Sequence, residues 1–284
     1  MMRASGWLEG PVLRSAALGA VCLLLVFVFF LAQFPYARLR VPLAGAASDA
    51  LGAEVTIGAL HGGPTGVRLE QVWVRRAGSP AWEVAWVRLR PAFSLGWLRG
   101  IPALALRAEA WGVHLDGTAF LDAQAPGFDG RVRGLDPAAL PPGLLADEPP
   151  WIGAIDLDAD LVRGAAGPEG RLVLSGSEGA LSIPGLPFAL PYDRVEGRAQ
   201  LGPEGVQLEA FELEGPMLSG SAQGRLGAGP PAQAPLDVEL TLRRAVPEIR
   251  DLLRGLGVPL GADGRARLRI GGTLQAPVVT PLGG

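Results

Sequence analysis

The feature that most constrains the fold is an alternation of apolar with polar or small residues, which recurs from about residue 54 to the end of the chain. Gly or Pro separates the alternating segments, which include residues 54–60, 82–90, 154–161 and 236–244. A period of two is that of a β-strand with one covered face. Parallel strands covered on both faces read instead as continuous apolar runs, and their crossover helices are missing here. We therefore expect a mainly β fold, an elongated and curved antiparallel sheet shaped like a groove or taco.

A second feature is an apolar run near the N-terminus. No charged residue occurs between Ser15 and Ala37, and about 20 helical residues cross the roughly 30 Å of a bilayer core. This predicts a single transmembrane helix at 15–37 after a short cytoplasmic tail, 1–14. A cleaved signal peptide is the alternative. The nearest small-x-small site, at residues 44–46, lies well past the run, so we expect the segment to stay attached.

The rest of the chain divides at a Pro-rich stretch, because its prolines interrupt strand pairing. Two short helices are expected beside the strands. One opens at Pro42, and the other lies near 247–255, where Pro247 precedes an apolar stripe. The expected segments are a first β segment at 38–134, the Pro-rich connection at 135–151 and a second β segment at 152–284.

The amino-acid composition argues against several classes of function. The formal net charge is -3 and every basic residue is Arg, without the clustered basic surface that a nucleic-acid-binding protein needs. Cys22 is the only cysteine, so no intrachain disulfide is possible. His61 and His114 are the only histidines, too few for most zinc sites or histidine relays.

Three aspartates invite comparison with a calcium loop. Asp156, Asp158 and Asp160 form D-x-D-x-D, but an EF-hand loop needs Gly at its sixth position and an acidic ligand at its twelfth. Those positions hold Leu161 and Gly167. Since the aspartates alternate with apolar residues, we interpret them as the solvated face of a strand.

No other motif carries recognisable chemistry. The sequence His61-Gly62-Gly63 is similar to the oxyanion segment of some esterases, but no G-x-S-x-G accompanies it. His114 alternates with apolar neighbours and is expected to point out of a strand. We therefore predict no catalytic, cofactor-binding or metal-binding residue and no enzymatic activity. Five tryptophans fit either core packing or contact with a membrane interface: Trp73, Trp82, Trp86, Trp97 and Trp111.

Two segments resemble AsmA-like envelope proteins: LGAEVTIGALHGGPTGVRLEQVWVRR (51–76) is similar to their opening, and GADGRARLRIGGTLQAPVV (261–279) to their repeat ending G-x-L-x-x-P. The middle, IPGLPFALPYDRVEGRAQLGPEGVQLEAFELEGPMLSGSAQGRL (183–226), resembles more specifically the type II secretion system protein N family. That family has no catalytic residues that could be carried over.

The resemblance implies a single-pass protein of the cell inner membrane, with its bulk in the periplasm, that serves as an accessory component of a type II protein secretion system. Its partners would be the membrane and other secretion-system or envelope proteins. The alternative is lipid binding or transfer of the AsmA-like type, with phospholipid in an apolar groove. Alternation alone leaves open whether the interior is a filled core or an open groove, because both need the same residues.

Overall fold

The fold is seen in a computed structural model of the chain. The structure describes residues 21, 22, 26, 29, 35–63, 65–75, 80–93, 100–122, 125–140, 151–164, 167–182, 189–228, 233–255, 261, 265–273 and 276–282.

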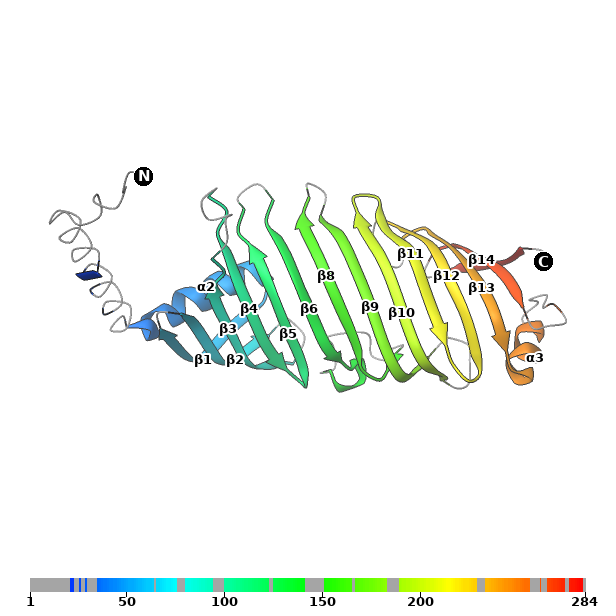
Figure 1. Cartoon of the computed structure of the whole chain (residues 1–284), viewed down its shortest axis with the longest axis horizontal. Coiled ribbons are helices and arrows are strands. Elements are labelled where there is room, and N and C mark those ends of the chain that lie inside the picture. The colour runs from blue at the N-terminus through cyan, green and yellow to red at the C-terminus, as the bar shows by residue number, and fades with distance from the viewer. Residues whose placement is uncertain are drawn as a thin grey trace, which may run out of the picture.

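The chain is mainly β, and its strands form one elongated antiparallel sheet in which almost every strand pairs with the next along the chain (Figure 1). β6 pairs with β8 across the Pro-rich connection, so the strands before and after it belong to the same sheet. The short β7 pairs with β9 instead. The strands are β1 (Glu54–Gly63), β2 (Gly66–Arg75), β3 (Trp82–Pro91), β4 (Ala103–Ala110), β5 (Val113–Phe120), β6 (Gly127–Leu135), β7 (Trp151–Ile152), β8 (Ile155–Arg163), β9 (Pro168–Leu181), β10 (Leu190–Gly202), β11 (Gly205–Glu214), β12 (Leu218–Gly227), β13 (Leu236–Ala245), β14 (Ala266–Gly272) and β15 (Pro277–Leu282).

Short helices lie beside the sheet. η1 (Tyr36–Leu39) leads into α2 (Arg40–Leu51), which ends at Gly52 in the left-handed conformation that glycine adopts without strain. Near the other end of the sheet, α3 (Pro247–Gly255) follows β13. Another short helix, η3 (Pro137–Ala139), follows β6 and is capped by the Asp136 side chain.

The structure contradicts the prediction of a transmembrane helix at 15–37. Among the described residues, no helix is both long and apolar enough to cross a membrane. α2 has 12 residues, which cover about 18 Å of the roughly 30 Å that a crossing needs. Within the predicted span the structure describes residues 21, 22, 26, 29 and 35–37, of which Tyr36 and Ala37 belong to η1. The other residues of that span, and the tail at 1–14, lie outside the described residues.

The period of two is interrupted where strands change phase. Ile57 and Leu60 are both buried on one face although three positions separate them. The change occurs at Gly58, opposite Gln71, whose φ is 54°. A Cβ at Gly58 would lie 2.9 Å from the Gln71 Cβ, so glycine is required at this close approach.

A second change of phase lies at Glu178, which has φ of 56°. Tyr192 and Val195, also three positions apart, are buried on the same face of the neighbouring strand. Each interruption keeps the apolar side chains on one side of the sheet.

The buried clusters lie on either side of the stretch from β4 to β8. Near the N-terminal end, Val55, Ile57 and Leu69 pack beneath η1 and α2. Further along, Tyr192, Val195 and Leu213 form a second cluster. Two smaller clusters involve α3 and strands β10, β13 and β14.

The outer edge of β15 lacks most of the donors that another strand would need. Thr273 and Ala276 exchange two backbone hydrogen bonds of 3.3 and 3.1 Å at the start of the β14–β15 hairpin. Hydrogen-bonded pairs alternate in an antiparallel ladder, so the backbone groups of Pro277, Val279 and Pro281 point away from β14. Proline has no N–H, which leaves Val279 as the donor among the three.

At the opposite edge, the helix that precedes β1 occupies backbone groups of that strand. The N–H of Val55 donates to the Ser48 hydroxyl at 2.8 Å, and the carbonyl of Gly58 accepts from Arg40 at 3.0 Å. Prolines on edge strands and covered edges are both known ways to prevent edge-to-edge association.

The double change Pro277→Thr and Pro281→Thr is expected to cause self-association, because it restores two outward N–H donors on β15. Sedimentation velocity should show dimers and larger species that increase with protein concentration, while the parent chain stays unchanged. The control is Val278→Thr, which alters a residue whose N–H already pairs with β14. A double variant that sediments like the parent would contradict this role for the prolines.

Candidate functional site

One face of the sheet carries two continuous rows of apolar residues or glycine, and we call these rows together the apolar strip. Their members are directly opposite one another on successive strands, so their side chains share a face. The first row is Leu60, Leu69, Val87, Ala108, Leu115, Val132, Leu157, Leu174, Gly197, Phe211, Ala222, Leu240, Leu268 and Pro281. The second row is Gly62, Val67, Leu89, Leu106, Gly117, Gly130, Ala159, Leu172, Ala199, Leu208, Gly224, Val238, Ile270 and Val279.

The middle of the apolar strip is not covered by any of the four buried clusters. These clusters, defined among the described residues, include no side chain of β4, β5, β6 or β8. Among the described elements the sheet is a single layer here, although Ala159 of the second row is only 9% exposed.

An aromatic group lies on this face where β10 and β11 meet β7. The Trp151 indole N–H donates to the Tyr192 hydroxyl at 2.7 Å. The Trp151 ring also stands edge-on to Phe211, with centroids 6.4 Å apart. Sequence analysis missed this group, because Trp151 follows a Pro-rich connection and no local pattern relates it to strands 40 or more residues away.

The opposite face carries charged side chains, many of them in pairs between neighbouring strands. In one row across β4, β5, β6 and β8, the residues are Arg107, Asp116, Arg131 and Asp158. Arg107 lies 2.5 Å from Asp116, and Arg131 is bonded to Asp158. The hydrogen bond to Asp158 and the charge of that carboxylate raise the pKa of Arg131. Opposite charges that alternate across strands stabilise a solvated face only modestly.

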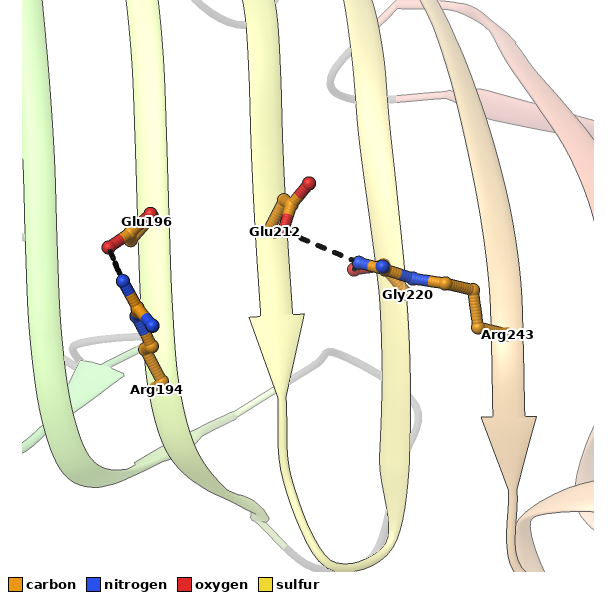
Figure 2. A network of polar contacts seen from close by, with 5 residues as sticks. All are labelled: Arg194, Glu196, Glu212, Gly220 and Arg243. Atoms are coloured by element: carbon orange, nitrogen blue, oxygen red, sulfur yellow. Dashed lines mark hydrogen bonds and ion pairs between the residues drawn. The ribbon is translucent and has the colours of Figure 1, made fainter.

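Ion pairs also occur on β10 to β13 (Figure 2), although Glu196 and Glu212 stand directly opposite each other there. Arg194 bonds to Glu196 along one strand, and this contact raises the pKa of Arg194. Arg243 of β13 reaches across β12, where it donates to the Gly220 carbonyl at 3.5 Å, and lies 3.5 Å from Glu212 of β11. On β13 and β14, Arg269 holds Asp237 by two hydrogen bonds of 2.7 Å, which lower the pKa of Asp237.

An open hollow of about 890 Å³ lies on this charged face. Trp86 stands at one end of it, and side chains of both signs line it, among them Arg133, Asp160 and Arg171. The mixture of charges and the ion pairs already formed there give it no single ligand chemistry.

The residues singled out in the sequence do not come together. Asp158 pairs with Arg131, and Asp156 accepts from the Gly134 N–H at 2.9 Å. Asp160 stands opposite Arg171 in the register of β8 and β9. Within the described ranges, no group of His, Cys, Asp and Glu could hold a metal ion.

The histidines lie on different strands. His61 is exposed at 3.6 Å from Glu70, and His114 lies 3.9 Å from Glu109. Gly62, beside His61, approaches the Tyr36 ring so closely that a Cβ there would lie 2.0 Å from it. The glycine therefore allows η1 to pack on β1.

The tryptophans divide between the two faces and the turns. Trp82 is buried, whereas Trp73 is exposed. Trp86 lies under the Arg68 guanidinium at 5.2 Å and donates to Glu109 at 3.0 Å. Trp111 lies in the turn between β4 and β5 with φ of 51°. Trp97 is outside the described residues.

No family model, curated protein or solved structure matches the chain.

Proposed function

We propose that the chain is a non-enzymatic protein of the cell envelope that holds lipid acyl chains against the apolar strip. The observation that carries this proposal is the continuity of the two apolar rows over β4 to β8, where none of the four buried clusters covers them. A face of this kind gains free energy by excluding water, at roughly 25 cal/mol per Å² of apolar surface buried.

The composition of the strip favours hydrocarbon over a protein partner. Protein interfaces concentrate Trp, Tyr, Met and Arg at their centres, and these anchors carry most of the binding energy. The strip between β4 and β8 consists of Leu, Val, Ala and Gly, with the Phe128 ring close to its glycines Gly117 and Gly130. It offers no side-chain hydrogen-bond donor or acceptor, so its occupant needs no polar groups there. Methylene chains meet that requirement, at about 0.8 kcal/mol for each CH₂ buried.

The compartment we propose is the periplasm, and this rests on the resemblance to AsmA-like envelope proteins. The test of lipid binding is native mass spectrometry of the protein extracted in mild detergent, followed by lipid analysis. Phospholipid should be present in stoichiometric amount. Protein that stays lipid-free after incubation with phospholipid would overturn the proposal.

A second proposal is an accessory role in a type II secretion system, through contacts with other secretion-system proteins. The specific support is the resemblance of residues 183–226, which form much of β10, β11 and β12. Arg194, Glu196 and Glu212 on these strands present charged groups to solvent (Figure 2). Affinity purification of the tagged chain should recover secretion-system subunits. Normal secretion after clean deletion of the gene would count against this role.

A further inference from the structure

Three arginines stand directly opposite one another on the charged face and form one continuous row of positive charge over three strands. Arg68 pairs in register with Arg88, and Arg88 pairs with Arg107, on β2, β3 and β4. We call these three residues the arginine row. From Arg107 onward, the same row continues with alternating signs through Asp116 and Arg131.

Like charges directly opposite each other destabilise a sheet, whereas opposite charges stabilise it. Pairs of like charges also occur at Asp129–Asp160 and at Glu196–Glu212, but the arginine row extends over three adjacent strands. Solvation alone accounts for scattered charges on a face, but it gives no reason for three guanidinium groups in adjacent register positions.

The outer two arginines of the row have counter-charges. Arg68 lies 2.8 Å from Glu70, and Arg107 lies 2.5 Å from Asp116. Arg88, between them, forms no ion pair with any described residue. Partial desolvation, and then the charges of Arg90, Arg68 and Arg107, lower the pKa of Arg88, although an arginine stays charged.

Arg90 adds an unsatisfied donor next to the row. Its Nε atom is buried and has no hydrogen-bond partner among the described residues. An arginine carries five N–H donors in a planar fork, so Arg88 leaves several donors without a described partner, beside the buried Nε of Arg90.

We propose that the arginine row, with Arg90, is a binding site for a phosphate-bearing anion. Guanidinium groups bind phosphate oxygens in a bidentate manner, and opposed residues on neighbouring strands bring their Cβ atoms within about 5.5 Å. A phosphate placed over Arg88 would neutralise the charge that no carboxylate of the described chain neutralises. The anion is either a free phosphate compound or the phosphate of a lipid headgroup.

The site is independent of the proposed acyl-chain function, because it lies on the other face of the sheet. Inorganic pyrophosphate, which has no acyl chain, is therefore the first probe. Calorimetric titration at low ionic strength should show binding to the parent chain and at least a tenfold loss in Arg88→Gln. Arg131→Gln, which removes the same charge from the alternating part of the row, should bind like the parent.

Thermal unfolding gives a second measurement. Pyrophosphate should raise the unfolding temperature of the parent and of Arg131→Gln, because a ligand that binds only the folded state stabilises it. It should leave Arg88→Gln unchanged. Without pyrophosphate, Arg88→Gln should unfold at the same or a higher temperature than the parent, because a like-charge contact has been removed.

Vesicles distinguish the two sources of phosphate. Co-sedimentation with phosphatidylglycerol but not phosphatidylcholine vesicles, lost in Arg88→Gln, would support a lipid headgroup, whether or not pyrophosphate binds. Binding of pyrophosphate alone would support a free phosphate compound. Failure of both probes to bind, or an equal loss in Arg131→Gln, would overturn the site.

Discussion

Replacing Val195 with Asp is expected to abolish cooperative folding of the strands around β10. Val195 is 0% exposed and belongs to the cluster with Tyr192 and Leu213. An unpaired carboxylate in such a place costs several kcal/mol or forces the group to stay protonated. The free energy of unfolding of a typical domain is only about 5–15 kcal/mol. In this sheet few buried clusters contribute to that stability.

Urea unfolding followed by circular dichroism measures the effect. Val195→Asp should lose its folding transition or show a much lower midpoint, and Val195→Ala should lose about 2 kcal/mol from two missing methyl groups and the cavity they leave. The matched control is Gln200→Asp on the same strand, where the side chain is exposed and stands opposite Arg171. If both aspartate variants unfold alike, burial of Val195 is not what stabilises this region.

The double change Leu115→Gln and Leu157→Gln is expected to remove at least nine-tenths of the bound lipid with a much smaller effect on folding. Both leucines lie in the first row of the apolar strip, on either side of Val132. Because they belong to none of the buried clusters, their amide groups would stay solvated when no ligand is bound. The binding surface, however, would contain polar groups that hydrocarbon cannot satisfy.

The control is Val173→Gln, which replaces an apolar residue on the charged face between Asp158 and Arg198. Lipid content after extraction should match the parent in this variant. Equal lipid loss in both variants would place the lipid elsewhere. A parent chain that carries no lipid and sediments as a dimer would instead identify a second copy as the occupant of the strip.

The antiparallel sheet followed from the sequence because side-chain alternation is a local property of each strand. Residues 154–161 and 236–242 alternate without interruption, and they form much of β8 and β13. The phase changes at Gly58 and Glu178 were not predicted, because they depend on paired backbone distortions in two strands. Residues 277–282 fall within the predicted second β segment, but their position as the edge strand β15 was not predicted, because an edge is defined by the order of the whole sheet.

The transmembrane prediction at 15–37 failed because hydropathy alone counts apolar residues, whereas the structure has no described helix that meets the length requirement. The sequence also could not predict that the apolar strip is uncovered over β4 to β8, because a covered face and an uncovered face have the same alternation. The arginine row could not be seen either, because Arg68, Arg88 and Arg107 become neighbours only through the register of three strands.

The up-and-down order of the strands determines the order in which they should unfold under force. Each strand makes its extensive contacts with the strands just before and after it in the chain, so the structure behaves as a linear array in which stability spreads from neighbour to neighbour. Pulling on the C-terminus should peel β15, then β14, then β13, in a series of small force steps. Strands held beneath α2 at the far end would keep their amide protons protected from exchange until last.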